Sequence, residues 1–85
     1  MTISYSKNFI KQSKKLDKSI RQQLLERIEL FNNNPLDSKL NNHPLKGKCK
    51  KYRSINVTGD FRALYLMQDD LFIFDIVGTH SQLYG

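Results

Sequence analysis

The sequence has a single cysteine, Cys49, among its 85 residues, so no disulfide can form within the chain. Folding must therefore rely on packing alone, as is usual for a cytosolic protein, and we predict a cytoplasmic location. No apolar run is long enough to span a bilayer, and the first residues, MTISYSKNF, lack the apolar core of a signal peptide. We expect no contact with a membrane.

The sequence also lacks motifs for metal and phosphate chemistry. Its two histidines, His43 and His80, and its one cysteine are not arranged with the spacing of metal ligands. There is no glycine-rich phosphate loop, and Cys49 has no neighbouring base that would mark it as a nucleophile. We predict no metal and no small-molecule cofactor.

The positive charge of the chain is concentrated before residue 63. The formal net charge is +6, and all 14 lysines and arginines lie at or before Arg62. A basic surface of this kind attracts a polyanion such as a nucleic acid. A solvated surface that only keeps the protein soluble is the alternative, and an acidic protein partner is compatible with either. Residues 43–62 contain one acid, Asp60, against six basic residues: Lys46, Lys48, Lys50, Lys51, Arg53 and Arg62.

Two helices are predicted in the first part of the chain. After a short strand over residues 2–5, Ser6 is the residue type of a helix N-cap, for a helix that runs to about residue 16. Asp17 can cap a second helix, in which apolar residues recur at intervals of four and three from Ile20 to Phe31. The run Asn-Asn-Asn-Pro at residues 32–35 ends it. The two helices should form a hairpin.

Three strands follow a predicted loop over residues 36–47. They are expected over residues 52–57, 61–67 and 71–77, with turns at residues 58–59 and 69–70. The last strand is apolar except for Asp75, which is typical of a central strand. We predict one α+β domain over residues 1–85: a short N-terminal strand, a two-helix hairpin and a three-strand antiparallel meander, with the helices packed on one face of the sheet.

The other face of this sheet is left open, and polar residues can meet there. Ser54 and Asn56 alternate with Ile55 and Val57, so the polar pair should point to the open face. The loop before the strands and the C-terminal tail can reach the same face. The available groups are cations, two imidazoles, a carboxylate, an amide and a ring, from His43, Lys46, Lys48, Lys50, Asn56, Asp60, Arg62, His80 and Tyr84.

These side chains are the parts needed to cleave RNA without a metal. Attack by the 2′-hydroxyl needs a base that takes its proton and an acid that protonates the leaving 5′-oxygen. Histidine titrates near pH ~6.5 and can serve either role. An arginine can bind two phosphate oxygens as charge builds there. A ring such as Tyr84 can stack on a base, which is worth ~1–3 kcal/mol.

Four segments stand out in order along the chain: HPLKG at 43–47, YR at 52–53, GDFRALY at 59–65 and GTHSQLYG at 78–85. With the helical hairpin upstream, they resemble the RelE superfamily of bacterial toxins, and most closely its YafQ branch. The resemblance covers the whole chain. It implies a RelE-like fold and a toxin of a type II toxin–antitoxin system. Such toxins cleave mRNA in the A site of the 30S ribosomal subunit and are neutralised by a cognate antitoxin protein.

The resemblance also implies roles for single residues. His80 and Asp60 become the leading acid–base candidates, with His43 in support, and Arg62 would stabilise the phosphate. YafQ-like toxins carry a histidine where this chain has Asn56, so the site has one imidazole fewer, and an amide cannot exchange a proton near neutrality. RNA contacts are expected from Lys46, Lys48, Lys50, Arg53, Asn56, Phe61 and Tyr84.

Structural alternatives stay open for several of these residues. His80 could cap the end of the last strand, Tyr84 could pin the tail by packing, and Asp60 could serve a turn. Asp75 could be the carboxylate that balances the arginines of the strands. As a function, a non-catalytic binder on the same fold, like the ParE relatives that inhibit gyrase, is the alternative to a nuclease.

Overall fold

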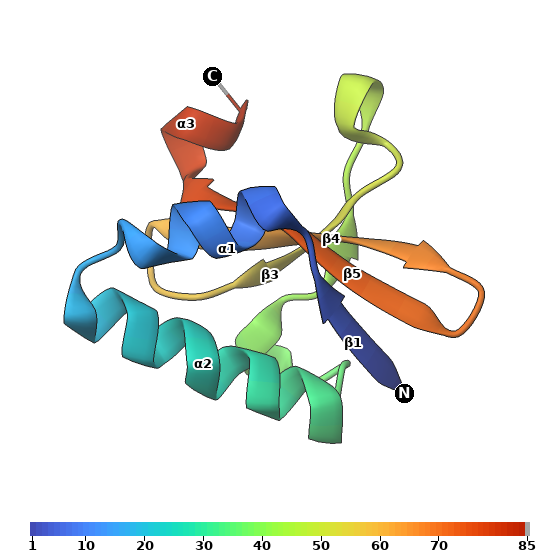
Figure 1. The fold of residues 1–85 in the computed structure, drawn as a ribbon. Helices are drawn as coiled ribbons and strands as arrows, with labels where there is room; N and C mark the ends of the chain where they lie inside the picture. The colour runs from blue at the N-terminus through green and yellow to red at the C-terminus, as the bar shows by residue number, and fades with distance from the viewer. Residues whose placement is uncertain (85) are drawn as a thin grey trace.

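The computed structural model describes residues 1–84 as a five-stranded sheet with helices around it (Figure 1). The strand order is β1-β5-β4-β3-β2, with β1 parallel to β5 and every other pair antiparallel. The elements are β1 (Thr2–Tyr5), α1 (Lys7–Lys14), α2 (Lys18–Asn33), η1 (Ser38–Leu40), β2 (His43–Pro44), η2 (Gly47–Cys49), β3 (Arg53–Asn56), β4 (Phe61–Gln68), β5 (Leu71–Thr79) and α3 (His80–Tyr84).

The predicted α+β class and the antiparallel meander are confirmed. β3, β4 and β5 pair in sequence order, and β4 and β5 extend one and two residues beyond the predicted ends. Asp69 has a φ of 54°, which allows the tight turn between β4 and β5. The predicted loop over residues 36–47 instead contains η1 and the two-residue edge strand β2. Pro44 can join that strand because an edge position leaves its missing N–H without consequence.

The start of α1 follows the sequence prediction, and the start of α2 departs from it. The Ser6 hydroxyl oxygen accepts a hydrogen bond from the Phe9 N–H at 3.0 Å, so Ser6 is the N-cap. Asp17 stands at the N-cap position of α2, but its side chain makes no capping hydrogen bond. The predicted side-chain cap is therefore wrong. The backbone carbonyl of Asp17 alone begins that helix, by accepting from the Arg21 N–H at 2.9 Å.

The core lies between α2 and one face of the sheet. Phe31 of α2 is completely buried and packs edge-on against the rings of Tyr65, Phe72 and Phe74. Burying each large apolar side chain contributes about 1.5–3 kcal/mol. Other core residues come from α1, α2, η1, the strands β3 to β5 and the residue that follows β3: Phe9, Leu24, Ile28, Leu40, Ile55, Val57, Ala63 and Val77.

The opposite face, called the outer face below, carries Ser54, Asn56, Arg62 and Leu64, because side chains alternate along β3 and β4. It is less open than predicted. α3 and the loop of residues 45–51 rise on this side, with α2 on the other side (Figure 1). Ser54 and Leu64 are 0% and 1% exposed as a result. The C-terminal tail thus folds back as a short helix, which the sequence reading did not include.

Candidate active site

Strand register brings the polar residues of the outer face together. His43 on β2 is the partner of Ser54 on β3, which in turn faces Leu64. Two residues further along β3, Asn56 is opposite Arg62 on β4. The predicted set of His43, Asn56 and Arg62 therefore shares one face of three neighbouring strands.

α3 adds His80 and Tyr84 to this face. The His80 N–H donates to the Asp60 carbonyl oxygen at 2.9 Å, which joins the start of α3 to the turn before β4. The rings of His80 and Tyr84 lie 4.6 Å apart, edge to face, and the Tyr84 hydroxyl donates to the Ser54 oxygen at 3.2 Å. The tail is thereby fixed over the sheet. The last residue of the predicted tail segment, residue 85, lies outside the described residues.

The guanidinium of Arg62 is held by backbone rather than by a carboxylate. Its Nη1 donates to three carbonyl oxygens, those of Thr58, Gly59 and Phe61, at 2.9, 3.2 and 3.0 Å. These are all the hydrogen bonds of this side chain among residues 1–84. Carbonyl groups orient the cation without neutralising its charge, so the remaining N–H groups can still bind an anion.

Asp75 does not balance the arginines, and that prediction is wrong. Its carboxylate accepts a hydrogen bond from the Tyr52 hydroxyl at 2.6 Å. The hydrogen bond from Tyr52 is the largest cause that lowers the pKa of Asp75 below its usual value. Burial, and then the hydrogen bond and charge of Asp75, raise the pKa of Tyr52 to about 12. The Asp75 carboxylate is thus paired with Tyr52 and not with an arginine.

The side chain of Asn56 contains a buried hydrogen-bond acceptor that has no donor within residues 1–84. Its side-chain oxygen Oδ1 is shielded from solvent and has no hydrogen-bond partner among residues 1–84. Such an orphan costs about 1–3 kcal/mol and needs an explanation in a folded protein. In this chain it lies on β3, directly opposite Arg62.

His43 is oriented by its own loop. Its Nδ1 lies 2.7 Å from the carbonyl oxygen of Asn41, which can only accept, so Nδ1 carries a proton. The Nε2 of the neutral ring has no hydrogen-bond partner within residues 1–84 and can act as an acceptor. Such a ring can take up a proton at Nε2 while the Asn41 contact holds it in place.

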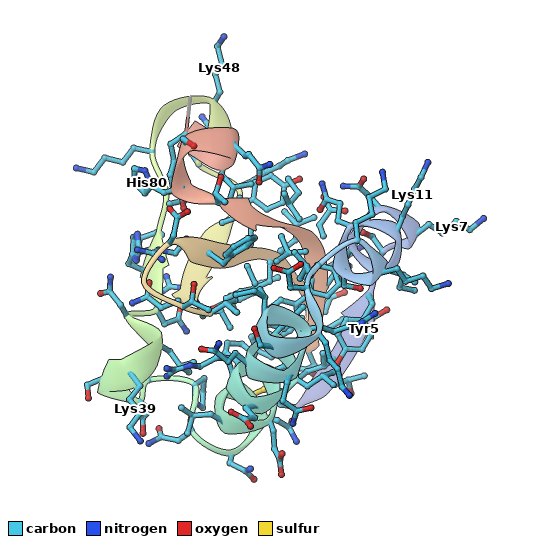
Figure 2. All side chains as sticks on the ribbon, turned by 90° about the vertical axis from the view of Figure 1, so that its left-hand side faces the viewer. Tyr5, Lys7, Lys11, Lys39, Lys48 and His80 are labelled. Atoms are coloured by element: carbon cyan, nitrogen blue, oxygen red, sulfur yellow. The ribbon has the colours of Figure 1, made fainter. Side chains whose placement is uncertain are left out.

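The other predicted RNA-binding residues divide into two groups. Lys46, Lys48 and Lys50 are exposed on the loop that contains η2, and Figure 2 shows Lys48 projecting from the same end of the molecule as His80. Arg53 and Phe61, by contrast, lie on the core-facing side of their strands. Arg53 donates to Asn42 Oδ1 at 3.0 Å and to the Tyr65 hydroxyl at 3.2 Å, and Phe61 packs against the core. The structure does not bring these two together with the outer-face residues.

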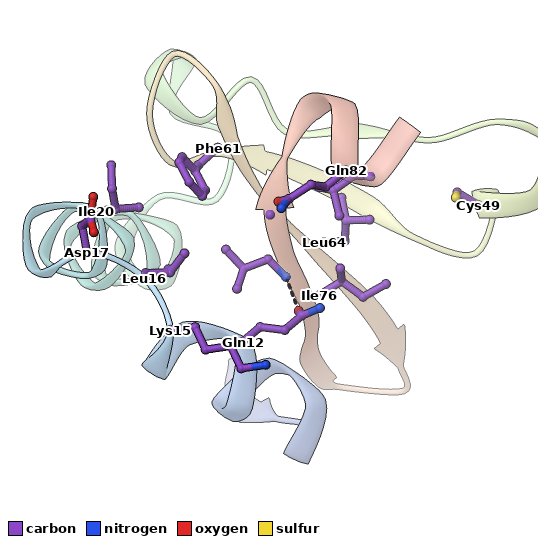
Figure 3. Close-up of a pocket in the computed structure, with 13 residues that line it drawn as sticks. Gln12, Lys15, Leu16, Asp17, Ile20, Cys49, Phe61, Leu64, Ile76 and Gln82 are labelled. Carbon is purple, nitrogen blue, oxygen red and sulfur yellow. Dashed lines mark hydrogen bonds between the residues drawn. The ribbon is translucent and has the colours of Figure 1, made fainter. Parts of the chain in front are cut away.

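A pocket of about 640 Å³ lies beside the site, between the α1–α2 corner and α3 (Figure 3). Gln12 Oε1 accepts from the Val77 N–H at 2.8 Å, at the part of β5 that β1 does not cover. Of the predicted site residues only Phe61 lines it. Sequence reading gave no sign of this pocket or of Ser54 as the anchor of the tail. No group of three or more metal-ligating side chains occurs within residues 1–84.

None of the helices described for residues 1–84 has both the length and the apolar character to cross a membrane.

Comparison with known proteins gives matches over nearly the whole chain. A family described as "Bacterial toxin of type II toxin-antitoxin system, YafQ" matches residues 1–85. The mRNA interferase toxin YafQ of Escherichia coli (strain K12) is 35% identical over 82 residues, which are 95% of this chain and 88% of the relative. The predicted resemblance to the YafQ branch is confirmed.

Solved structures agree with the sequence matches. The crystal structure of YafQ from E. coli strain BL21(DE3) has a TM-score of 0.82 at 33% identity, covering 98% of this chain and 97% of that one. YafQ in the E. coli DinJ-YafQ complex has a TM-score of 0.73 at 32% identity over the same shares. A YoeB/ParE toxin from Agrobacterium tumefaciens, at 16% identity and a TM-score of 0.77 over 94% of this chain and 99% of that one, bears on the fold alone.

Proposed function

The chain belongs to the YafQ family of bacterial toxins of type II toxin–antitoxin systems, and we propose that it is an mRNA interferase that cuts ribosome-bound mRNA by metal-independent acid–base catalysis. Endoribonuclease activity of this kind is named for its E. coli relatives. The observation that supports the proposal is the backbone hydrogen bond of 2.9 Å from the His80 N–H to the Asp60 carbonyl. It brings the main chains of these two residues together near the end of the face that bears Arg62, from which their side chains can exchange protons.

The reaction proceeds by attack of the RNA 2′-hydroxyl on the adjacent phosphorus. A bond forms from the 2′-oxygen to phosphorus, and the bond from phosphorus to the 5′-oxygen breaks. His80 and Asp60 between them remove the 2′-proton and protonate the leaving oxygen, and the Nε2 of His43 supports this exchange. The free N–H groups of Arg62 bind the phosphate oxygens as negative charge builds there. The products are a 2′,3′-cyclic phosphate and a 5′-hydroxyl.

RNA lies along the outer face in this proposal. Lys46, Lys48 and Lys50 contact its phosphates, and Tyr84 stacks on a base next to the cut. The Asn56 amide turns to the RNA and accepts a hydrogen bond that the protein itself does not supply. Arg53 and Phe61, the remaining residues predicted to bind RNA, do not contact it in this proposal. They act from the core-facing side of the sheet, by stabilising the turns next to the site.

Two macromolecular partners follow from this function. A cognate antitoxin protein covers the basic outer face, as expected for a toxin whose relative YafQ has been solved in complex with DinJ. The second partner is the translating ribosome, where mRNA is exposed in the A site of the 30S subunit. The toxin would then act in the cytoplasm.

The test is primer extension on mRNA in a reconstituted translation system. Wild-type protein should cut the message, and His80→Gln and Arg62→Ala should each lower the rate constant at least 100-fold, the lower range for removal of a proton-transfer group or an electrostatic stabiliser. Lys39→Ala is the control, because Lys39 lies at the far end of the molecule from His80 (Figure 2). Fully toxic variants without any cleavage would overturn the proposal. Inhibition of gyrase supercoiling in a parallel assay would then favour the ParE-like alternative.

A further inference from the structure

The Tyr52–Asp75 pair, which the proposed chemistry does not use, lies at the base of the basic loop, residues 45–51. The backbone of Tyr52 closes this loop: its carbonyl oxygen accepts from the Leu45 N–H at 3.0 Å, and its N–H donates to the Cys49 carbonyl at 2.9 Å. The side chain of Tyr52 is only 9% exposed. A contact that holds Tyr52 in place therefore holds both ends of the basic loop, because Tyr52 follows residue 51 and is hydrogen-bonded to Leu45.

Asp75 is held on its other side by α1. The register between β4 and β5 changes between Leu64 and Tyr65, so that Asp75 is left without a cross-strand partner, in a β-bulge. The Asp75 carbonyl oxygen accepts from the Ser6 hydroxyl at 3.2 Å and from the Asn8 amide at 3.1 Å. The bulge therefore presents the carboxylate from a backbone that the start of α1 keeps in place.

We propose that Asp75 and Tyr52 are positioning residues, which hold the basic loop in the arrangement that binds RNA. The proposal rests on the RNA contacts proposed above for the loop lysines. Within residues 1–84, the Tyr52–Asp75 hydrogen bond of 2.6 Å is the one side-chain hydrogen bond that ties residues 45–52 to the rest of the protein. The other hydrogen bonds of the loop, such as Cys49 N–H to the Lys46 carbonyl, are internal.

A fixed loop matters because Lys46, Lys48 and Lys50, three exposed lysines among the four of the loop, must meet phosphates at set spacings in the proposed function. An ordered loop has already lost the conformational entropy that RNA binding would otherwise cost. A loose loop would keep its charge and lose that advantage. The binding of RNA should then weaken while the acid–base groups continue to work. His80 and Asp60 lie on α3 and the β3–β4 turn, and His43 is oriented by Asn41, outside the loop.

The matched test compares Tyr52→Phe, which keeps the ring and removes the hydroxyl, with Tyr5→Phe, an exposed tyrosine on β1. Asp75→Asn keeps an acceptor oxygen and serves as the conservative variant. Two quantities are measured: amide hydrogen exchange at Leu45, and KM against kcat for mRNA cleavage on translating ribosomes. Tyr52→Phe should speed exchange at Leu45 and raise KM, each about tenfold, with kcat within twofold of wild type. Asp75→Asn should fall between Tyr52→Phe and wild type, and Tyr5→Phe should match wild type.

The outcomes separate this inference from the proposed function. Unchanged exchange at Leu45 in Tyr52→Phe would show that the hydroxyl does not hold the loop and would overturn the inference. Faster exchange with an unchanged KM, or with a loss in kcat alone, would also overturn it, because the loop would then not position RNA. If wild-type protein cut no mRNA, the proposed function would fail, whereas the exchange measurement would still report whether the Tyr52–Asp75 hydrogen bond holds the loop.

Discussion

Replacing Asn56 by leucine should make the protein more stable and less active. The Asn56 side chain sits on β3 with its Oδ1 buried and without a hydrogen-bond partner among the described residues. Leucine has a similar shape and no polar atom, so Asn56→Leu removes the cost of the orphan acceptor. The same change removes the amide that we expect to bind RNA.

The size of the effect follows from the burial of one oxygen. An unsatisfied buried acceptor costs about 1–3 kcal/mol, and an imperfect fit of a new apolar side chain costs up to about 1.5 kcal/mol. We expect a net gain of about 1 kcal/mol in the free energy of unfolding. In a domain of this size that corresponds to a rise in Tm of about 4–8 °C. Cleavage should fall at least tenfold.

Urea unfolding and primer extension on the same preparation measure both effects. Gln68→Leu is the matched control, because Gln68 is an exposed strand residue on the same face, and its stability should stay within about 0.5 kcal/mol of wild type. A less stable Asn56→Leu protein would refute the reasoning about the orphan oxygen. A more stable protein that cleaves at the wild-type rate would refute the RNA contact.

Three further predictions concern pH, the tail and the core. Because the pKa of Asp75 is lowered in the folded state, Asp75 adds to the free energy of unfolding above the usual carboxyl pKa of 3.8, and this contribution is lost as the pH falls through the lower folded value. Because the pKa of Tyr52 is raised to about 12, Tyr52 adds to the free energy of unfolding below pH 10.0, and this contribution is lost as the pH rises through about 12. Urea unfolding at a series of pH values should show both contributions in wild type. Tyr52→Phe should lose the alkaline one and keep a smaller acid one, because the charge of Lys51 also lowers the pKa of Asp75. Gly78→Ala would place a Cβ 2.9 Å from Gln82 Oε1 and push that side chain away from the Thr79 N–H, to which it is hydrogen-bonded at the start of α3. Primer extension should then show slower cleavage, while stability falls by less than about 1.5 kcal/mol. Phe31→Ala should cost about 3–5 kcal/mol in urea unfolding, because the ring is fully buried.

Local signals in the sequence predicted the fold well where a single residue decides the geometry. Ser6 has the hydroxyl that a helix N-cap needs, and the Asp69-Asp70 pair marks a turn that tolerates a positive φ. Strand periodicity likewise predicted β3, β4 and β5. Four short elements were not predicted, namely η1, β2, η2 and α3, because two to five residues are too few to show a period.

For the candidate site, the sequence predicted which residues of paired strands share a face, but it wrongly grouped Arg53 and Phe61 with them. His43, Asn56 and Arg62 do share a face, since alternation along paired strands determines it. The partner of Asp75 was not predictable, because a β-bulge changes which side chains meet and leaves no mark in the pattern of apolar residues. Nor was the lack of a hydrogen-bond partner for the Asn56 oxygen predictable, because it depends on how side chains far apart in the sequence pack together.

The most direct test of the central claim is cleavage, on translating ribosomes, of an mRNA that carries one 2′-deoxynucleotide immediately 5′ of the scissile phosphate. If the 2′-hydroxyl is the nucleophile, wild-type protein should cut the all-ribose message to a 2′,3′-cyclic phosphate and leave the substituted message intact at that position. Equal cleavage of both messages would contradict the account, because water would then be the attacking group.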